Sequence, residues 1–374
     1  MKCLSLVAVW VGLWVPVAAA AGPDDLVFIH HSCGRNWLNA GLDAALLAKD
    51  YIDERNDIYY STDVSADAGR PDSLGPNPGD STNMNHWVKW FNDYLAGVQA
   101  HGCSDGQNRI ILFKSCYPIS NVSSDGTEPG NPFSSSQTIT NYKAVYRHPS
   151  GAGNTYASGG TTYQALEEVF AAHPETLFIP VTAPPRSYST TTDAEGHRAR
   201  LFNDWLSSDW QAAYDAANPG LCNVAVFDWF DVLAYADDHA EHPNRLKAEY
   251  GGTYSDSHPN TTANVDSTVI FASGADNFID AAWNRFRPAP GDATRDGKVN
   301  YMDLGILATN YGQTGMTWDD GDFTGDHAVS YLDLGILSTC YGTGGAGIPV
   351  VPEPAALSLL LAAGAIPLRR LRRR

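Results

Sequence analysis

The residues that decide the fold of most of this chain read Leu26-Val27-Phe28-Ile29-His30-His31-Ser32-Cys33-Gly34. Four consecutive apolar residues predict a strand that is covered on both faces. A serine follows just after the expected strand, and the glycine two residues later permits a tight turn of the backbone. The stretch therefore predicts a buried strand that delivers a hydroxyl group to the edge of a sheet.

Strand-like and helical segments alternate from this point through residues 24–287. Strands are expected at residues 26–31, 57–62, 109–114, 176–181 and 223–228. Helices are expected at residues 40–50, 85–100, 161–172, 195–217 and 261–286. This alternation predicts an α/β fold with a parallel sheet and helices on both faces, and the alternative is an α+β domain with a mixed sheet. Residues 63–84 and 122–160, rich in small and polar residues, are expected to form long surface loops.

Three polar residues predict a catalytic site. Ser32 follows the carboxyl end of a strand, which is where ligands bind in open α/β sheets. Near the end of the same region the chain reads Asp256-Ser257-His258-Pro259-Asn260. An aspartate two residues before a histidine can orient its imidazole, and the imidazole can then take the proton of a serine, which alone is a weak nucleophile. These residues predict Ser32 as nucleophile, His258 as general base and Asp256 as the group that orients it.

Simpler interpretations of the same residues stay open. Ser32 could only cap the helix that follows it, and residues 256–259 could be an ordinary polar loop. Cys33 could be the nucleophile in place of its neighbour. His30 and His31 could ligate a metal ion, although no third ligand is evident in the sequence.

This combination resembles the SGNH (GDSL-like) hydrolase superfamily over residues 24–287, and the start from His30 to Trp37 resembles uncharacterised secreted proteins that begin His-His-Ser-x-Gly-x-Asn-Trp. The resemblance implies a flavodoxin-like three-layer α/β/α sandwich, a catalytic set of Ser32, Asp256 and His258, and ester hydrolysis that needs no cofactor. The family binds the oxyanion with the serine N–H, a glycine N–H after the second strand and an asparagine side chain. Gly69 and Asn121 are the nearest candidates for the last two donors.

Two features depart from the family pattern. The usual Gly-Asp-Ser-Leu is replaced by His-His-Ser-Cys at residues 30–33, and residues 114–121 stand where Gly-x-Asn-Asp is usual. Because the loss of one oxyanion donor costs about a hundredfold or more in rate, these changes bear directly on activity.

A duplicated calcium-binding pattern fills residues 291–342, after a linker at residues 288–290. Each copy is an aspartate-rich loop that continues as Gly-Ile-Leu and ends in Tyr-Gly, and the two copies are offset by thirty residues. Calcium takes six to eight oxygen ligands, which a twelve-residue loop supplies from positions 1, 3, 5, 7, 9 and 12. In the first loop the expected ligands are Asp292, Thr294, Asp296, the Lys298 carbonyl, Asn300 (directly or through water) and Asp303. In the second they are Asp322, Thr324, Asp326, the Ala328 carbonyl, Ser330 and Asp333.

The repeat resembles a type I dockerin, which implies a small all-α domain with two bound Ca²⁺ ions and a cohesin-like partner. Two features depart from that pattern. Position 3 of both loops is threonine rather than asparagine or aspartate, and His327 stands where the first loop has Gly297. We therefore expect the second loop to bind calcium more weakly.

Both ends of the chain resemble targeting segments. Residues 1–21 carry a basic start, an apolar run and small residues at the end, which predicts a signal peptide. Residues 351–374 read Val-Pro-Glu-Pro, an apolar stretch and then an arginine-rich end, which resembles a PEP-CTERM sorting signal of bacteria and implies processing by an exosortase. Residues 343–350 are glycine-rich and are expected to be a flexible linker. The protein is accordingly expected to be exported, with a transient membrane anchor at its C-terminal end.

Charge and cysteine content narrow the function. The net charge is −18, and removal of both targeting segments takes away Lys2, five arginines and Glu353, which leaves 41 acidic and 18 basic residues. So acidic a protein is not expected to bind nucleic acid. Five cysteines remain, which leaves room for one or two disulfides outside the cytoplasm and at least one free thiol.

The function predicted from these features is a secreted serine esterase that deacylates an extracellular polysaccharide or another acylated glycan. The carbohydrate substrate rests on the association of dockerin-like modules with polysaccharide enzymes. The alternative is a non-catalytic exported protein that binds glycans or has a structural role at the cell surface.

Overall fold

The computed structural model describes residues 24–59, 83–104, 107–295, 297–324 and 326–343. The expected signal peptide, Gly69, Asp296 and the sorting tail lie outside these residues, as does the expected linker beyond Thr343. Within the described ranges, no helix has the length and apolar character that crossing a membrane requires.

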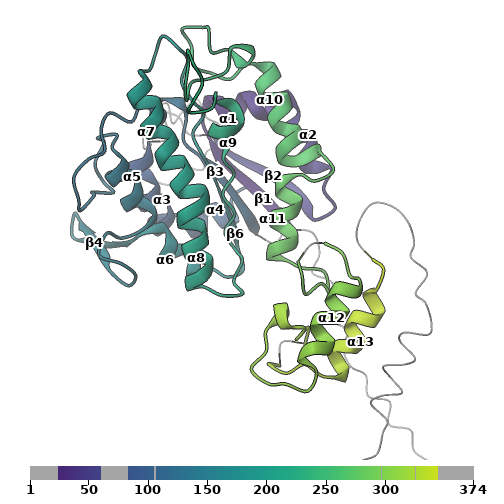
Figure 1. The fold of residues 1–374 in the computed structure, drawn as a ribbon. Coiled ribbons are helices and arrows are strands. Elements are labelled where there is room, and N and C mark those ends of the chain that lie inside the picture. Colours follow the sequence, from purple (N-terminus) through teal and green to yellow (C-terminus); the bar gives the residue numbers. More distant parts are fainter. Residues whose placement is uncertain (1–23, 60–82, 105–106, 296, 325, 344–374) are drawn as a thin grey trace, which may run out of the picture.

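Four parallel strands form the central sheet of the large part of the molecule (Figure 1). They are β1 (Asp24–His30), β2 (Ile52–Tyr59), β3 (Asn108–Lys114) and β6 (Leu177–Val181). Their order is β2-β1-β3-β6, and every neighbouring pair is parallel. Because parallel strands end at the same edge, the carboxyl ends of β1 and β3 bring residues 31–33 and 115–117 close together.

The expected fifth strand pairs with β6 only through two isolated parallel bridges, Phe178 with Val224 and Val181 with Phe227. The interruption has a physical cause in β6 itself. Pro180 has no N–H, so it cannot donate the hydrogen bond that would join the two bridges into one ladder. Its carbonyl still accepts a bond from the Phe227 N–H at 2.9 Å.

The sheet is buried on both faces because alternate residues of each strand enter separate apolar clusters. On β1, Leu26 and Phe28 belong to one cluster, whereas Val27 and Ile29 belong to the other. This arrangement confirms the predicted α/β class with a parallel sheet and is compatible with a three-layer fold. The mixed sheet of the α+β alternative is wrong for the described strands.

Helices cover both faces, and Figure 1 shows most of the two groups on opposite sides of the sheet. One face carries α3 (Trp87–Asp93), α4 (Leu95–Ala100), α5 (Ile139–Tyr146), α6 (Leu166–Ala171), α7 (Asp193–Asp204) and α8 (Gln211–Ala217). The other carries α1 (Ser32–Trp37), α2 (Asp43–Leu47), α9 (Trp229–Leu233), α10 (Thr261–Thr268) and α11 (Phe278–Phe286).

Several boundaries differ from the sequence-based predictions. The helix expected at 161–172 begins only at Leu166, because residues 161–164 form β5 and pair in a hairpin with β4 (Thr155–Ser158). The loop expected at 122–160 contains α5, whose N-cap Thr138 accepts a hydrogen bond from the Asn141 N–H. Strand β2 starts at Ile52, five residues before the predicted start at residue 57. It lies at the edge of the sheet, where charged residues such as Arg55 are tolerated because they form ion pairs at the side of the strand.

The repeat forms a small helical unit in which α12 (Tyr301–Asn310) and α13 (Tyr331–Cys340) lie side by side (Figure 1). The two halves exchange equivalent contacts. The Gly342 N–H donates to the Val299 carbonyl and the Gly312 N–H donates to the Val329 carbonyl, both at 2.8 Å. Leu307 and Leu337 are fully buried in the small core that the halves share.

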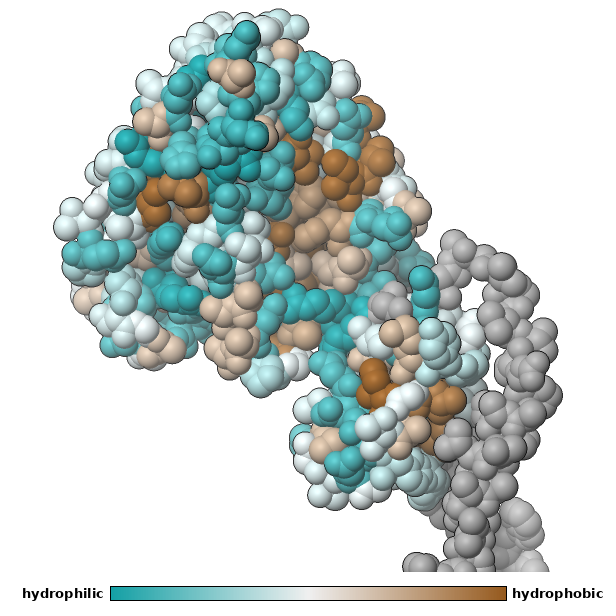
Figure 2. Space-filling model, in the orientation of Figure 1, coloured by the Kyte–Doolittle hydropathy of each residue, from teal (hydrophilic) through white to brown (hydrophobic). Residues whose placement is uncertain are grey.

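Most of the face that Figure 2 shows is hydrophilic, with apolar patches over the region of α2 and α10 and on the helical unit. The apolar residues exposed in the first region are Leu47, Val265, Val269 and Ile270.

Candidate active site

Ser32 is the first residue of α1 and follows β1 after a single connecting residue. The turn depends on Gly34, because a Cβ atom at this position would lie 2.3 Å from the Cβ of His30. Further along, the Trp37 indole N–H donates to the Thr268 hydroxyl at 3.0 Å and ties α1 to α10. The loop that precedes α10 is thereby held beside the start of α1.

The loop that carries Asp256 and His258 is fixed by the serine between them. Ser257 is buried, and its hydroxyl accepts a hydrogen bond from the Ser187 N–H at 3.1 Å and lies 2.8 Å from the Thr190 hydroxyl. With Ser257 turned inward, its two neighbours face the opposite way, toward solvent and Ser32.

The three predicted catalytic residues form one hydrogen-bonded chain. The Nε2 atom of His258 lies 2.7 Å from the Oγ atom of Ser32, and its Nδ1 atom lies 2.6 Å from Oδ1 of Asp256. The backbone N–H of His258 also donates to the Asp256 carboxylate at 3.2 Å. Tyr117 packs against the imidazole, with ring centroids 4.9 Å apart. The structure therefore brings together residues that are 226 positions apart in the sequence.

The charge of Asp256 sets the tautomer of His258. Burial raises the pKa of Asp256, but the hydrogen bonds from His258 outweigh it and hold the pKa below its ordinary value. An ionised Asp256 only accepts hydrogen bonds, so Nδ1 of His258 carries the proton and Nε2 is left to accept one from Ser32.

The structure argues against two of the simpler interpretations. The N-cap of α1 is His31, and the Ser32 hydroxyl contacts His258 and Cys116 rather than a helix amide. His30 is fully buried, with Nε2 directed at Asp57 at 3.3 Å, whereas the ring of His31 packs against Tyr59.

Two thiols lie beside the serine. The Sγ atoms of Cys33 and Cys116 are 3.3 Å apart, and Cys116 Sγ is 3.4 Å from Ser32 Oγ. Burial raises the pKa of Cys33 well above its usual value, which argues against Cys33 as the nucleophile. The pKa of Cys116 is lowered, chiefly by its hydrogen bond with Cys33 and also by the nearby charge of Lys114. All five described cysteines are free thiols, so the disulfides that their number allows are not formed in this structure.

Lys114 at the end of β3 is a further feature that the sequence did not reveal. Its side chain is almost fully buried, its Nζ atom has no hydrogen-bond partner among the described residues, and it lies 5.4 Å from the ring centre of Trp229. A buried amino group without hydrogen bonds costs stability.

Replacement of Lys114 by methionine is therefore expected to stabilise the protein by about 1–3 kcal/mol, because the methyl thioether fills the same space without a polar end. Urea unfolding of both proteins measures the difference, with Lys89→Met, an exposed position on α3, as control. A lower stability of the Lys114 variant would show that the cation–π contact outweighs the cost of burial.

Of the expected oxyanion donors that the structure describes, only the Ser32 N–H is placed at the site. The Ser32 N–H is the first amide of α1, and such an amide has no intrahelical acceptor. The Asn121 N–H donates to Pro118, and its side chain has no hydrogen bond with the three catalytic candidates in the described structure. Gly69 lies outside the described residues.

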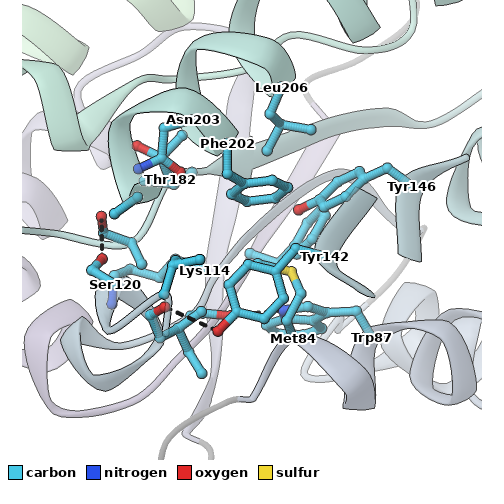
Figure 3. A pocket seen from close by; sticks show the side chains of 17 residues that line it. Met84, Trp87, Lys114, Ser120, Tyr142, Tyr146, Thr182, Phe202, Asn203 and Leu206 are labelled. Atoms are coloured by element: carbon cyan, nitrogen blue, oxygen red, sulfur yellow. Dashed lines mark hydrogen bonds between the residues drawn. The ribbon is translucent and has the colours of Figure 1, made fainter. Parts of the chain in front are cut away.

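The internal cavity in Figure 3 is separate from this site. It lies on the other side of the sheet, bordered by Trp87, Lys114, Tyr142 and Phe202, and none of the three catalytic candidates lines it. Its free volume of about 10 Å³ is room for a single water molecule. An acyl group must therefore reach Ser32 from the solvent side, where His258 is partly exposed.

A polar groove of about 370 Å³ lies along α1, the turn after it and β2. Arg35, which is three residues after Ser32 on α1, lines it together with Arg55, Asp43 and Asp57. Ion pairs join these side chains, with Arg55 2.6 Å from Asp43 and 3.2 Å from Asp57. The groove therefore offers charged hydrogen-bonding groups that begin about one helical turn after Ser32 on α1.

The first loop of the repeat gathers three of its expected ligands. The Thr294 hydroxyl lies 3.1 Å from Asp292 and 3.0 Å from Asp303, and the Gly297 N–H donates to Asp292 at 2.8 Å. Both carboxylates are fully buried. Asn300 is used differently, since its side chain accepts from the Met302 N–H as the N-cap of α12.

The second loop repeats this geometry. Thr324 donates through its hydroxyl to Asp322 at 3.1 Å and through its N–H to Asp333 at 2.9 Å. His327 takes the place of Gly297 and has a φ of 64°, in the left-handed region that disfavours side chains. Ser330 caps α13 in the way that Asn300 caps α12.

The donor set of both loops fits a cation. Two buried carboxylates lie close together in each loop, and neither Asp303 nor Asp333 forms an ion pair with a basic side chain among the described residues. Buried negative charges of this kind are normally balanced by a bound ion or a paired charge. Asp326 is joined to the second loop through its N–H, which donates to Asp322 at 3.3 Å, while its carboxylate accepts a hydrogen bond from the Ala328 N–H at 2.9 Å.

Comparisons of the chain with protein-family models, with curated proteins and with solved structures found no match.

Proposed function

We propose that residues 24–287 form a secreted serine esterase of the SGNH type that removes acyl groups from an extracellular carbohydrate. The observation that carries the proposal is the chain of hydrogen bonds from Asp256 through His258 to Ser32, with lengths of 2.6 and 2.7 Å. The strand order β2-β1-β3-β6, extended by the bridges at residues 224 and 227, supports a flavodoxin-like arrangement, in which the site lies at the carboxyl edge of the sheet.

The proposed reaction begins with attack of the Ser32 oxygen on the acyl carbon. His258 takes the serine proton through Nε2 and then donates it to the departing alcohol oxygen, while Asp256 stabilises the imidazolium that forms in between. The Ser32 N–H is placed to donate a hydrogen bond to the oxyanion of the tetrahedral intermediate. Water then attacks the acyl-enzyme, again with His258 as the base, and none of these steps needs a cofactor.

A polar substrate is supported by two observations. The groove beside α1 is lined by charged side chains, which suit the hydroxyl groups of a sugar better than an alkyl chain. The helical unit that follows the catalytic part resembles modules that accompany polysaccharide enzymes, which favours a carbohydrate by association.

Turnover of a short-chain nitrophenyl ester, and release of acetate from acetylated xylan or chitin fragments, test the proposal. We expect the wild-type protein to hydrolyse the ester and the His258→Ala variant to lose the activity. The unfolding curves of the two proteins, followed by tryptophan fluorescence, are expected to be the same. No turnover of any acyl substrate by the folded protein would instead favour a non-catalytic, glycan-binding role.

Asp256→Asn is expected to lower kcat by about 10²–10³-fold, because the amide no longer selects the correct imidazole tautomer. The expected loss of kcat is smaller than the loss for a buried triad aspartate, because the Asp256 side chain is 64% exposed. Since the pKa of Asp256 lies below its ordinary value, the loss is expected to be constant from pH 6 to 8. Initial rates measure it, with the exposed substitution Asp238→Asn as a matched control, and an unchanged kcat would remove Asp256 from the mechanism.

We further propose that residues 291–342 form a dockerin-like module stabilised by two Ca²⁺ ions. The paired buried carboxylates, Asp292 with Asp303 and Asp322 with Asp333, support it. Tyr301 and Tyr331 occupy equivalent positions of the two helices and are 74% and 71% exposed, which supports a surface for a cohesin-like partner.

Export and exosortase processing complete the proposal. They rest on the sequence of residues 1–21 and 351–374. Mass spectrometry of the protein purified from the native cell surface tests both, since the mature chain is expected to lack the two segments.

A further inference from the structure

The side chains around Ser32 include a set of potential metal ligands, formed by the general base His258 and two thiols that the proposed hydrolysis does not use. Cys33, Cys116 and His258 each offer one ligand atom, and these atoms all lie within 4.8 Å of one another. Elsewhere in the described residues, no other group of three or more His, Cys, Asp and Glu side chains meets this geometry. The three residues come from separate elements: α1, the turn after β3 and the loop before α10.

The distances suit a small thiophilic cation. Zinc bonds to sulfur at about 2.3 Å, so two sulfurs in a tetrahedral site stand roughly 3.8 Å apart. The two Sγ atoms are 3.3 Å apart, so they need to separate by only about 0.5 Å, within the reach of small side-chain rotations. Ser32 Oγ, 3.4 Å from Cys116 Sγ, or a water molecule can fill the fourth position.

The surroundings of His258 also match a metal ligand. Histidines that bind metals through one nitrogen usually donate a hydrogen bond from the other to a carboxylate, which fixes the tautomer. Nδ1 of His258 is bonded in this way to Asp256 at 2.6 Å, so Nε2 is the nitrogen that faces the two thiols and Ser32. The sulfurs are buried, whereas the His258 side chain is 26% exposed and gives an ion a path from solvent.

We propose that Cys33, Cys116 and His258 form a binding site for a thiophilic divalent cation such as Zn²⁺, and that occupancy of this site switches the serine off. On binding, each thiol releases its proton to solvent and forms a sulfur–metal bond, and Nε2 donates its lone pair, without any transfer of electrons. The nitrogen that holds the ion can no longer accept the Ser32 proton. The inhibition rests on the proposed esterase function, whereas the binding does not.

Binding is tested on the mature protein in excess Ca²⁺, so that the repeat is saturated and does not take up zinc. Calorimetric titration with ZnCl₂ is expected to show one ion per chain. Cys33→Ser and Cys116→Ser are each expected to weaken the Kd at least about a hundredfold, because each removes one of three protein ligands. Cys222→Ser, a cysteine outside the cluster, is the matched control and should retain the wild-type Kd.

Cobalt gives an independent readout. Co²⁺ in place of Zn²⁺ is expected to produce a thiolate-to-cobalt absorption band in the wild-type protein and in Cys222→Ser, and no band in the other two cysteine variants. Absence of zinc binding, or binding that both of those variants retain, would overturn the proposal. A Cys33–Cys116 disulfide in the purified native protein would also overturn it, since the sulfurs would then not be available.

Inhibition is measured relative to the zinc-free rate of each protein. Zinc is expected to inhibit ester hydrolysis at concentrations near its Kd, a chelator to restore it, and the inhibition constant to rise about a hundredfold in Cys116→Ser. If the protein binds zinc through the cysteines but hydrolyses no ester, the metal-site proposal is supported and the esterase proposal is refuted. Full turnover by the zinc-saturated wild type would overturn the switch.

Discussion

Ser32→Ala is expected to lower kcat/KM for ester hydrolysis by about 10⁴-fold or more, because among the described residues no other hydroxyl group is hydrogen-bonded to Nε2 of His258 and able to give it a proton. The variant keeps its fold, since the hydrogen bonds that form the turn run from the Gly34 and Arg35 N–H groups to the His31 carbonyl and do not involve the hydroxyl. The Tm is therefore expected to change by no more than about 3 °C.

Steady-state kinetics and a thermal melt of the same samples check both parts of this expectation. Ser208→Ala is the matched control and should keep the wild-type rate. The Ser208 hydroxyl lies in the helical segment of residues 205–210 and donates to the Asp204 carbonyl. An alanine variant that still hydrolyses the ester, or one that loses activity only because it melts early, would contradict the catalytic role.

Removal of calcium is expected to have the largest effect on stability. Among the described residues, the helical unit has six buried apolar residues in its core and four buried carboxylates in its loops. The free energy gained from so small a core is set against the large electrostatic cost of burying four negative charges. An ion at 1,000 times its Kd stabilises the folded state by about 4 kcal/mol, and two such sites act on the same small unit. Chelation is thus expected to unfold the repeat near room temperature while residues 24–287 stay folded.

Hydrogen exchange of α12 and α13 in Ca²⁺, in chelator and in Mg²⁺ measures this directly. Asp303→Asn is expected to weaken calcium binding more severely than Asp333→Asn, because the second loop already contains His327 in a strained conformation. Equal protection of the two helices with and without calcium would refute the calcium proposal.

The parts of this molecule that the sequence predicted correctly depend on short-range patterns. The buried strand at residues 26–31 and the Asp-x-His pair at 256–258 can each be identified within a few residues, and general rules for parallel sheets then place strand ends at one edge. The paired aspartates of the repeat can be identified from equally short-range spacing, and their role as calcium ligands stays a prediction.

The parts that the sequence did not predict depend on long-range contacts. The contact of the Cys116 thiol with Ser32 depends on the direct pairing of β3 with β1, and no single segment of the sequence determines the order of the strands. The break in the fifth strand comes from Pro180 on its neighbour. Asn300 has an oxygen that can serve either an ion or the amide of Met302, and its spacing in the loop cannot decide between them.

The central claim, that Ser32 is a nucleophile activated by His258, is tested most directly by covalent labelling. The protein is treated with a serine-directed phosphonate, digested and mapped by mass spectrometry. The account predicts a single adduct on Ser32, with labelling slowed at least about a hundredfold in His258→Ala, which keeps the hydroxyl but removes its base. Labelling of another residue, or equally fast labelling of Ser32 without the imidazole, would contradict it.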